Sequence, residues 1–166
     1  MIDQLQPGDV LVADVFGKAE GGTIMGDNLA TAIYSATKGG GVVVDGGIRD
    51  LEGIAPIDMP VYYRHAHPSA IGGVMLTGYN IPVRIGDATV VPGDVVFGDR
   101  TGVYFIPPHT VAQIVDRAEE THIHDEWTKM KFLTGKYKSS ELYPTPRDPK
   151  LRQEYEEYKK KKLGKQ

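Results

Sequence analysis

Short apolar runs bounded by glycine, proline and aspartate dominate residues 1–120 of this 166-residue chain. The runs are too short for helices, and apolar runs between turn residues are typical of strands. Glycine is concentrated in the same part, with 18 of the 20 glycines, as a fold with many tight turns requires. We expect strands at residues 10–15, 42–44, 60–64, 81–85, 89–91, 95–97 and 103–106, the last three in a β-meander.

A stretch with helical spacing interrupts these strands directly after Gly26. Its apolar residues recur at intervals of three and four positions, which places them on one face of a helix. These residues are Leu29, Ala32, Ile33 and Ala36. Asp27 or Asn28 is a suitable N-cap. The free amides of the first turn can bind an anion such as a carboxylate.

From residue 108 onward the spacing of apolar residues is helical. A first-turn proline, Pro108, and a terminating glycine, Gly135, are natural ends for this helix. A proline-rich arm at 143–149 and a charged helix at 151–163 follow. A domain of this size does not need such elements for its own core. We therefore expect residues 121–166 to form a helical and proline-rich extension that contacts a neighbouring subunit.

Composition limits the classes of protein to which the chain can belong. Apolar residues make up 40% of the sequence, enough for one globular domain with an appendage. The absence of cysteine excludes disulfide frameworks, thiolate zinc sites and cysteine nucleophiles. The amino terminus does not resemble a signal peptide, and no apolar run reaches the roughly 20 residues that span a bilayer. We expect a cytoplasmic protein without a membrane partner.

Charge is distributed unevenly along the chain. Residues 1–120 carry 7 Lys and Arg against 15 Asp and Glu, whereas residues 121–166 carry 12 against 7. The acidic first part argues against a surface for nucleic acid. The basic tail could bind RNA, but its charges alternate with Glu and Tyr, which favours a solvated helix or a subunit contact. We expect no nucleic-acid partner.

Charged side chains follow both the helix start and the strand at 42–44. Asp27 alone is most simply a helix cap. Arg49 and Asp50 alone are most simply a surface ion pair, and residues 45–47 are first of all a turn. In a βα unit, however, strand ends and helix starts converge, so these groups can share one pocket. In such a pocket the helix start would bind an anion, Asp50 would bind a metal ion, and Arg49 would bind an oxyanion. Together these groups would form an active site.

Three longer motifs carry a resemblance to a known family. They are Pro-Gly-Asp-Val-Leu-Val at 7–12, Gly-Asp-Asn-Leu-Ala-Thr-Ala at 26–32 and Gly-Val-Val-Val-Asp-Gly-Gly-Ile-Arg-Asp at 41–50. Shorter matches follow in order at 60–61, 81–83, 91–94 and 99–103. Together these residues resemble the family of the regulator of ribonuclease activity A and 4-hydroxy-4-methyl-2-oxoglutarate aldolase. The resemblance covers residues 5–120, and the tail from His122 looks like an extension of one branch.

This resemblance implies an α/β fold, with a swivelling β/β/α domain over residues 1–120. It also implies a homotrimer or homohexamer with active sites between subunits. Family members usually have a long segment before the Pro-Gly-Asp strand, whereas this chain starts close to that strand. We therefore expect the domain to lack its usual amino-terminal segment.

The aldolase branch is similar to class II pyruvate aldolases, in which a divalent cation, usually Mg²⁺ or Mn²⁺, polarises a 2-oxo acid. The resemblance thus implies a lyase that cleaves a 4-hydroxy-2-oxo acid of the 4-hydroxy-4-methyl-2-oxoglutarate type to pyruvate. It also implies oxaloacetate decarboxylation as a further activity. Regulators of RNA-degrading enzymes are similar in scaffold but do not need the metal-site acids. A non-enzymatic regulator is therefore the alternative function, and the presence of both acids favours the enzyme.

The resemblance assigns substrate contacts to the helix start and to the arginine. The backbone from Gly26 through Asp27 and Asn28 to Leu29 would hold the pyruvyl carboxylate. Arg49 would contact the carbonyl oxygen that becomes an enolate oxygen. Arg49 and Asp27 are thus the expected catalytic residues.

The resemblance assigns the metal to Asp50, with Asp27 holding its water shell. A further acid from a neighbouring subunit's helix, Asp125 or Glu126, would complete the outer shell, and Glu126 is the residue we select. The family spacing from the first acid to the arginine is one residue shorter than in this chain. An extra residue at 37–41 keeps Asp27 in its role. If the extra residue lies earlier in the chain, Asn28 would take the place of Asp27, and its side chain is neutral.

Histidines occur in two clusters. His122 and His124 lie beside two acids and look like part of a metal site, but residues two apart on a helix point to different faces. A helix-surface role is therefore preferred. His65 and His67 would share one face of a strand, yet Pro68 indicates a loop, and contact with substrate is the less favoured interpretation.

Overall fold

The computed structural model describes residues 1–164. The chain divides into two compact units, Met1–Pro108 and a second unit that begins at His109. Residue 120, where we expect the family core to end, lies within a helix of the second unit, and that division stays a prediction. A parallel sheet with helices confirms the expected mixed α/β class.

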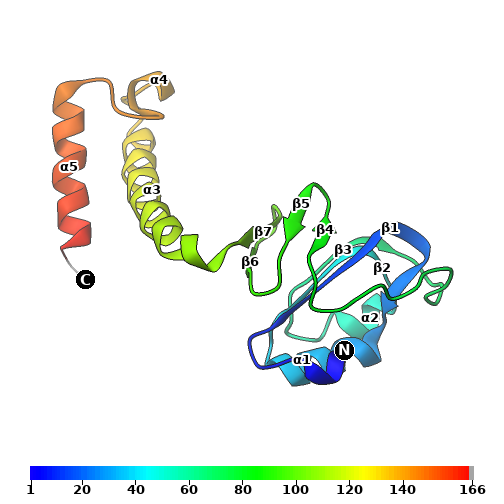
Figure 1. The fold of residues 1–166 in the computed structure, drawn as a ribbon. Helices are drawn as coiled ribbons and strands as arrows, with labels where there is room; N and C mark the ends of the chain where they lie inside the picture. The colour runs from blue at the N-terminus through cyan, green and yellow to red at the C-terminus, as the bar shows by residue number, and fades with distance from the viewer. Residues whose placement is uncertain (165–166) are drawn as a thin grey trace. The chain divides into compact units, whose positions relative to one another are not determined.

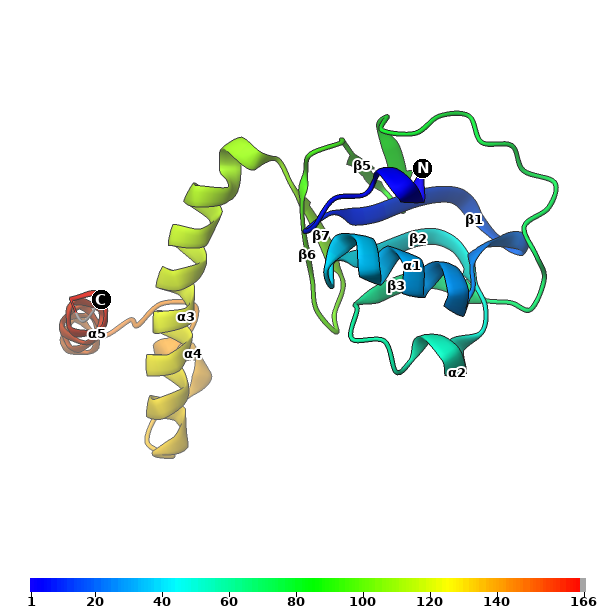
Figure 2. The same cartoon turned by 90° about the horizontal axis from the view of Figure 1, so that it is seen from below.

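A parallel sheet in the order β1–β2–β3 forms the centre of the first unit (Figures 1 and 2). The strands are β1 (Val10–Met25), β2 (Gly41–Ile48) and β3 (Val61–Ala66), and a 3-10 helix, η1 (Ile2–Gln4), precedes them. Helix α1 (Asp27–Thr37) connects β1 to β2 along one face of the sheet, and the short helix α2 (Leu51–Ile54) follows β2. Because the strands are parallel, their carboxyl ends lie at one edge of the sheet.

The helix expected after Gly26 is confirmed, but its buried face differs from the expected one. Leu29 is 44% exposed, and the buried residues are Ala30, Ile33 and Thr37. Thr37 can be buried because its hydroxyl donates to the Ile33 carbonyl at 2.8 Å. The apolar core of this unit comprises Leu11, Val15, Met25, Ala30, Ile33, Val42, Val44, Ile48, Ile54 and Met59.

Strand β2 continues through residues 45–47, so the turn expected there is wrong. The reason is the close approach of β1. An added Cβ on Gly46 would lie 2.7 Å from Cβ of Val15, and one on Gly47 would lie 2.9 Å from Oγ1 of Thr23. The two glycines therefore allow strand packing rather than a reversal of the chain. All eight residues of β2 are buried.

Strand β1 extends ten residues beyond the predicted end at residue 15. Its pairing with β2 shifts register after Asp14 and again after Lys18 and Thr23. Phe16 and Gly17 both have positive φ, 55° and 68°. These bulges make the strand bend, which is why the hydrophobic pattern did not predict it as one continuous element.

Two separate antiparallel hairpins, rather than one meander, occupy residues 83–106. They consist of β4 (Val83–Ile85) with β5 (Ala88–Val90) and β6 (Val95–Gly98) with β7 (Val103–Ile106). The turn between β5 and β6 explains the break. Asp94 accepts a hydrogen bond from the Val91 amide at 2.9 Å, so this amide is not available for pairing β5 with β6.

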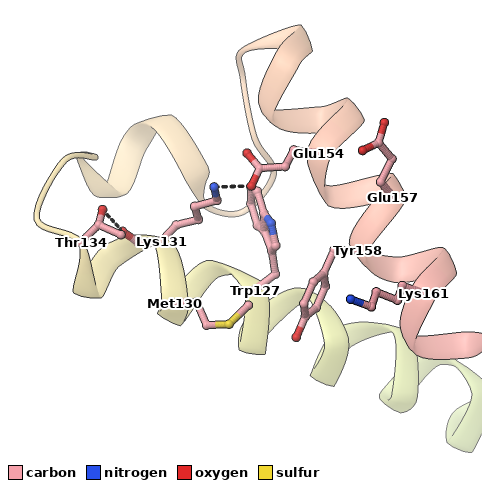
Figure 3. A pocket seen from close by; sticks show the side chains of 8 residues that line it. All are labelled: Trp127, Met130, Lys131, Thr134, Glu154, Glu157, Tyr158 and Lys161. Carbon is pink, nitrogen blue, oxygen red and sulfur yellow. Dashed lines mark hydrogen bonds and ion pairs between the residues drawn. The ribbon is translucent and has the colours of Figure 1, made fainter. Parts of the chain in front are cut away.

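The second unit is helical. After η2 (Pro108–Thr110), which begins at the last residue of the first unit, it contains α3 (Val111–Leu133), α4 (Ser139–Leu142) and α5 (Pro149–Leu163), which confirms both predicted helices. Ion pairs connect α3 to α5: Glu120 with Lys159 at 2.9 Å, Glu126 with Lys162 at 2.7 Å, and Lys131 with Glu154. The last pair lies beside Trp127 at a shallow pocket between the two helices (Figure 3). None of the helices between residues 1 and 164 is long and apolar enough to cross a membrane.

His124 is not a surface residue, so the helix-surface interpretation is wrong for this side chain, which is 14% exposed. Its ring packs edge-on against Tyr155 at a centroid distance of 5.1 Å, and Trp127 is next to the same tyrosine at 5.5 Å. The helix turns this histidine toward α5, where it contributes to a small aromatic core. Among the described residues, Nε2 of His124 and Oγ1 of Thr128 are buried without a hydrogen-bond partner.

Candidate active site

The ends of the three parallel strands meet at one edge of the sheet. The Arg49 amide donates to the Met25 carbonyl at 3.0 Å, and the His67 amide donates to the Ile48 carbonyl at 3.0 Å. The residues that directly follow β1, β2 and β3 therefore lie in a row. This row begins with Gly26, the N-cap of α1.

Asp50 and Arg49 lie directly against Gly26. An added Cβ on Gly26 would lie 2.2 Å from Oδ2 of Asp50 and 3.2 Å from Nε of Arg49. Any side chain at position 26 would therefore displace the acid. Nε of Arg49 and Oδ2 of Asp50 form an ion pair at 3.3 Å, and the two side chains are 43% and 46% exposed. Both charged groups are thus accessible to a small ligand at the start of α1.

Asp50 has a left-handed backbone, with φ 55° and ψ 46°. A non-glycine residue rarely adopts this conformation, and such outliers cluster at functional sites. Helix α2 holds the conformation in place, because the Asp50 carbonyl accepts from the amides of Gly53 at 3.0 Å and Ile54 at 3.1 Å. The backbone is thus held in a strained form that aims the carboxylate at the α1 start.

The side chain of Asp27 lies between the two helices. An added Cβ on Gly53 would lie 2.7 Å from Oδ2 of Asp27, so the acid packs against α2. Its Oδ1 accepts from the Asn28 amide at 2.8 Å. In residues 1–164 the amides of Asp27 and Leu29 have no hydrogen-bond partner, which leaves them for an anion.

The structure thus brings together Gly26, Arg49 and Asp50, as the sequence predicted, while the side chain of Asp27 packs against Gly53 of α2. Glu126 lies in the second unit, in α3. Hydrogen bonds from Lys162 and Tyr158 lower the pKa of its carboxyl. Its predicted place in an outer shell stays a prediction.

The carboxylates can supply oxygen ligands to a divalent cation. Residues 1–164 contain no cluster of three or more His, Asp or Glu side chains that would bind a metal by themselves. Magnesium, however, keeps several waters and is commonly held by one or two carboxylates together with substrate oxygens. Asp50 as a direct ligand and Asp27 as a partner for water fit that chemistry.

An ion pair on the central strand was missed by the sequence reasoning. Asp45 is 3% exposed, and its Oδ1 accepts from Arg64, while its Oδ2 accepts from the Gly86 amide at 3.1 Å. Burial tends to raise the pKa of Asp45, but the hydrogen bonds from Arg64 and Gly86 and the charge of Arg64 outweigh it, so the pKa is lowered. An acid within a run of buried valines was the available signal, because a buried charge needs a partner.

Comparison with known proteins decides the family. The RraA-like family, described as Aldolase/RraA, matches residues 1–105. The chain belongs to this family. A relative from Halalkalibacterium halodurans, named "Putative 4-hydroxy-4-methyl-2-oxoglutarate aldolase", is 30% identical over 126 residues, which are 74% of this chain and 58% of the relative. The chain therefore spans little more than half the length of that relative.

Solved structures agree with this assignment for the RraA-like chain. An uncharacterized protein from Pseudomonas syringae pv. tomato matches with a TM-score of 0.75 and 25% identity, over 82% of this chain and 63% of that one. Streptomyces coelicolor RraAS2, described as an unusual member of the RNase ES inhibitor RraA protein family, matches with a TM-score of 0.68 and 29% identity, over 78% and 65%. The family resemblance seen in the motifs is confirmed.

Proposed function

We propose that this RraA-like protein is a metal-dependent lyase that cleaves a 4-hydroxy-2-oxo acid to pyruvate. The observation that carries the proposal is the contact of Asp50 and Arg49 with Gly26 at the start of α1. In the proposed site the Asp50 carboxylate, the Arg49 guanidinium and the amides of the α1 start would surround one bound 2-oxo acid. Family membership and the printed name of the Halalkalibacterium relative support the same chemistry.

Each group has a role in a retro-aldol cleavage. The amides of Asp27 and Leu29 bind the carboxylate next to the 2-oxo group. A water molecule takes the proton of the C4 hydroxyl, the C3–C4 bond breaks, and the electron pair of that bond moves through C3 to the C2 oxygen. Arg49 stabilises the negative charge that develops on this oxygen. C4 becomes a carbonyl, and C3 takes up a proton from water to give pyruvate.

Asp50 would hold the divalent cation, Mg²⁺ or Mn²⁺, with Asp27 ordering its waters. When bound, the cation supplies charge stabilisation for the 2-oxo acid. We further propose the swivelling β/β/α form of the fold and a cytoplasmic homotrimer or homohexamer without a nucleic-acid or membrane partner. In that assembly Glu126 of a neighbouring copy would complete the outer shell.

Pyruvate release from 4-hydroxy-4-methyl-2-oxoglutarate, with and without a chelator, tests the lyase. We expect release that stops on chelation and returns with Mg²⁺ or Mn²⁺, and a slower oxaloacetate decarboxylation with the same metal dependence. Release without metal, or full activity of Asp50→Ala, would count against the proposal.

The alternative is a non-enzymatic regulator of RNA-degrading enzymes. The similarity to Streptomyces coelicolor RraAS2 favours it. This alternative predicts affinity for a ribonuclease assembly and no divalent-cation binding by calorimetry. The contact of Asp50 with Gly26 at the α1 start leads us to prefer the lyase, since a binding surface has no need of it.

A further inference from the structure

A cleft lies on the face of the parallel sheet opposite helix α1. Val42 and Val44 of β2 belong to the core that packs against α1. Side chains alternate between the two faces of a strand, so Val43 and Asp45 point to the other face. Both line the cleft and are only 4% and 3% exposed, so they form its floor. Tyr62, which pairs with Val43 in the sheet, lines the cleft from β3.

Two hairpins supply the opposite wall of this sheet cleft. Ile85 of β4 and Val103 and Phe105 of β7 line it, and all three are half-buried. The sheet cleft has a volume of about 320 Å³, at the lower end of the roughly 300–1,000 Å³ that is usual for small-molecule sites. Its lining is mostly apolar and includes the rings of Tyr62 and Phe105, which suits a flat ring.

Contacts between the hairpins and the sheet hold these walls in place. The Gly86 amide of the β4–β5 turn donates to Oδ2 of Asp45 at 3.1 Å. An added Cβ on Gly98 would lie 2.7 Å from the hydroxyl oxygen of Tyr62, so β6 packs directly on this ring. The walls are thus arranged before a ligand arrives, which lowers the entropic cost of binding.

Arg64 supplies a cation that is fixed along one edge of its guanidinium group. It lines the sheet cleft, and its Nε donates to Oδ1 of Asp45. An added Cβ on Gly17 would lie 3.4 Å from Cδ of Arg64, so the stem packs against the bulge in β1. Within residues 1–164, Nη1 and Nη2 have no hydrogen-bond partner, and the side chain is 49% exposed. These outer N–H groups are therefore available to a carboxylate, which a guanidinium binds through two parallel hydrogen bonds.

The charges around Arg64 are nearly balanced. Asp45 is its bonded partner, and the charge of Asp87 also acts on it. Arg84 in turn acts on Asp45. Two acids thus face two arginines, and no strong positive field surrounds the sheet cleft. A singly charged ligand with a large apolar part fits this balance, whereas a phosphate ester, with about two negative charges, does not.

We propose that the sheet cleft is a second ligand site, for a small aromatic carboxylic acid. The outer N–H groups of Arg64 bind the carboxylate. The ring packs against Val43, Tyr62 and Phe105. This proposal is independent of the lyase function, because the sheet cleft shares no residue with the candidate active site.

Calorimetry with probes of one carbon skeleton tests the second site. 2-Naphthoate is the aromatic acid, 2-naphthamide has a neutral amide instead of the carboxylate, and decahydro-2-naphthoate has a saturated skeleton. We expect 2-naphthoate to bind at least about tenfold more tightly than the amide, because the amide cannot form charge-assisted hydrogen bonds. The saturated acid should bind about threefold or more weakly than 2-naphthoate, because its bent skeleton cannot stack on the aromatic rings.

Arg64→Lys and Phe105→Leu test the two halves of the site. Lysine keeps the charge beside Asp45 but lacks the planar pair of donors, so the affinity for 2-naphthoate should fall about tenfold and that for 2-naphthamide should stay within about twofold. Phe105→Leu should weaken both probes about fivefold. Arg84→Lys and Tyr104→Leu are matched controls on the same hairpins, since neither is among the described residues that line the sheet cleft. Both controls should leave the affinities within about twofold, and melting by circular dichroism identifies the folded variants.

The candidate active site also contains a group for a carboxylate, so Arg49→Met separates the two sites. This variant should keep the affinity for 2-naphthoate within about twofold. Loss of binding in Arg49→Met but not in Arg64→Lys would place the probe at the start of α1 and overturn the second site. Absence of 2-naphthoate binding, or equal affinity for 2-naphthoate and either of the other probes, would overturn it as well. Because the titrations contain no 2-oxo acid, failure of the lyase assay leaves their outcome unaffected.

Discussion

Oδ2 of Asp50 lies 2.2 Å from the point where a Cβ on Gly26 would stand. The residue that caps α1 and the acid that follows β2 are therefore mutually dependent. A glycine at position 26 is a requirement of the site, although its sequence context suggests only a helix start.

Gly26→Ala should abolish activity, because the added methyl group would force the Asp50 carboxylate away from the α1 start. We expect at least about a hundredfold loss of pyruvate release, as for other small displacements of reacting groups. Gly72→Ala is the matched control, since a Cβ there meets nothing within 4 Å and its φ is not positive. Equal pyruvate release by both variants would show that the contact of Asp50 with Gly26 is unimportant.

Asp50→Asn should keep the fold but lose the cation. The amide is neutral and nearly the same size, so the left-handed backbone and the α2 start can persist. Calorimetric titration with Mn²⁺ should show binding in the wild type and none in the variant. Asp27→Asn should weaken binding less, because its proposed role is through water. A stronger effect at Asp27 than at Asp50 would reverse the two assignments.

The pairing of buried Asp45 with the half-exposed Arg64 should make the stability of the fold depend on acid pH. The pKa of Asp45 is lowered in the folded chain, so its contribution is fully present above the unfolded value of about 4 and is lost as pH falls through the lowered pKa. Asp45→Ala should cost about 2 kcal/mol at pH 7, since it leaves the Gly86 amide unpaired.

Denaturant titrations at several pH values check this prediction. The difference in unfolding free energy between wild type and Asp45→Ala should shrink steadily below pH 4. A difference that stays constant to pH 2 would mean that the carboxylate charge does not stabilise the strand.

Trp127 should control the folding of the helical unit. It is 1% exposed and packs against Tyr155 of α5. Trp127→Ala should destabilise this unit by about 3–5 kcal/mol and reduce helical circular dichroism. Leu133→Ala is the control, because Leu133 is 88% exposed in the same helix. Similar melting of the two variants would contradict a core at Trp127.

Local chemistry explains which features could be predicted from the sequence. The start of α1 follows from Gly26 and the apolar spacing after it. The pairing of Arg49 with Asp50 follows from their adjacency, and the meeting of both with Gly26 follows from the convergence of strand ends and helix starts. These features depend on neighbours within one βα unit, so a short segment of sequence contains them.

Features that depend on distant residues were missed. Gly46 and Gly47 suggested a turn because the sequence does not reveal that Val15 and Thr23 would press against them. The partner of Asp45 lies 19 residues away, on the next strand. His124 seemed to be on the surface because its cover, Tyr155, belongs to another helix. In each case a contact with a residue distant in the sequence determines the local structure.

The left-handed backbone of Asp50 gives a way to distinguish catalytic from silent members of such a scaffold. Glycine adopts that conformation without penalty, so Asp50→Gly should raise the unfolding free energy by about 1 kcal/mol while removing the carboxylate. A protein that does not need the Asp50 carboxylate would have a higher free energy of unfolding with glycine at position 50. In the proposed lyase, the left-handed backbone at Asp50 is the energetic cost of holding a carboxylate at the α1 start.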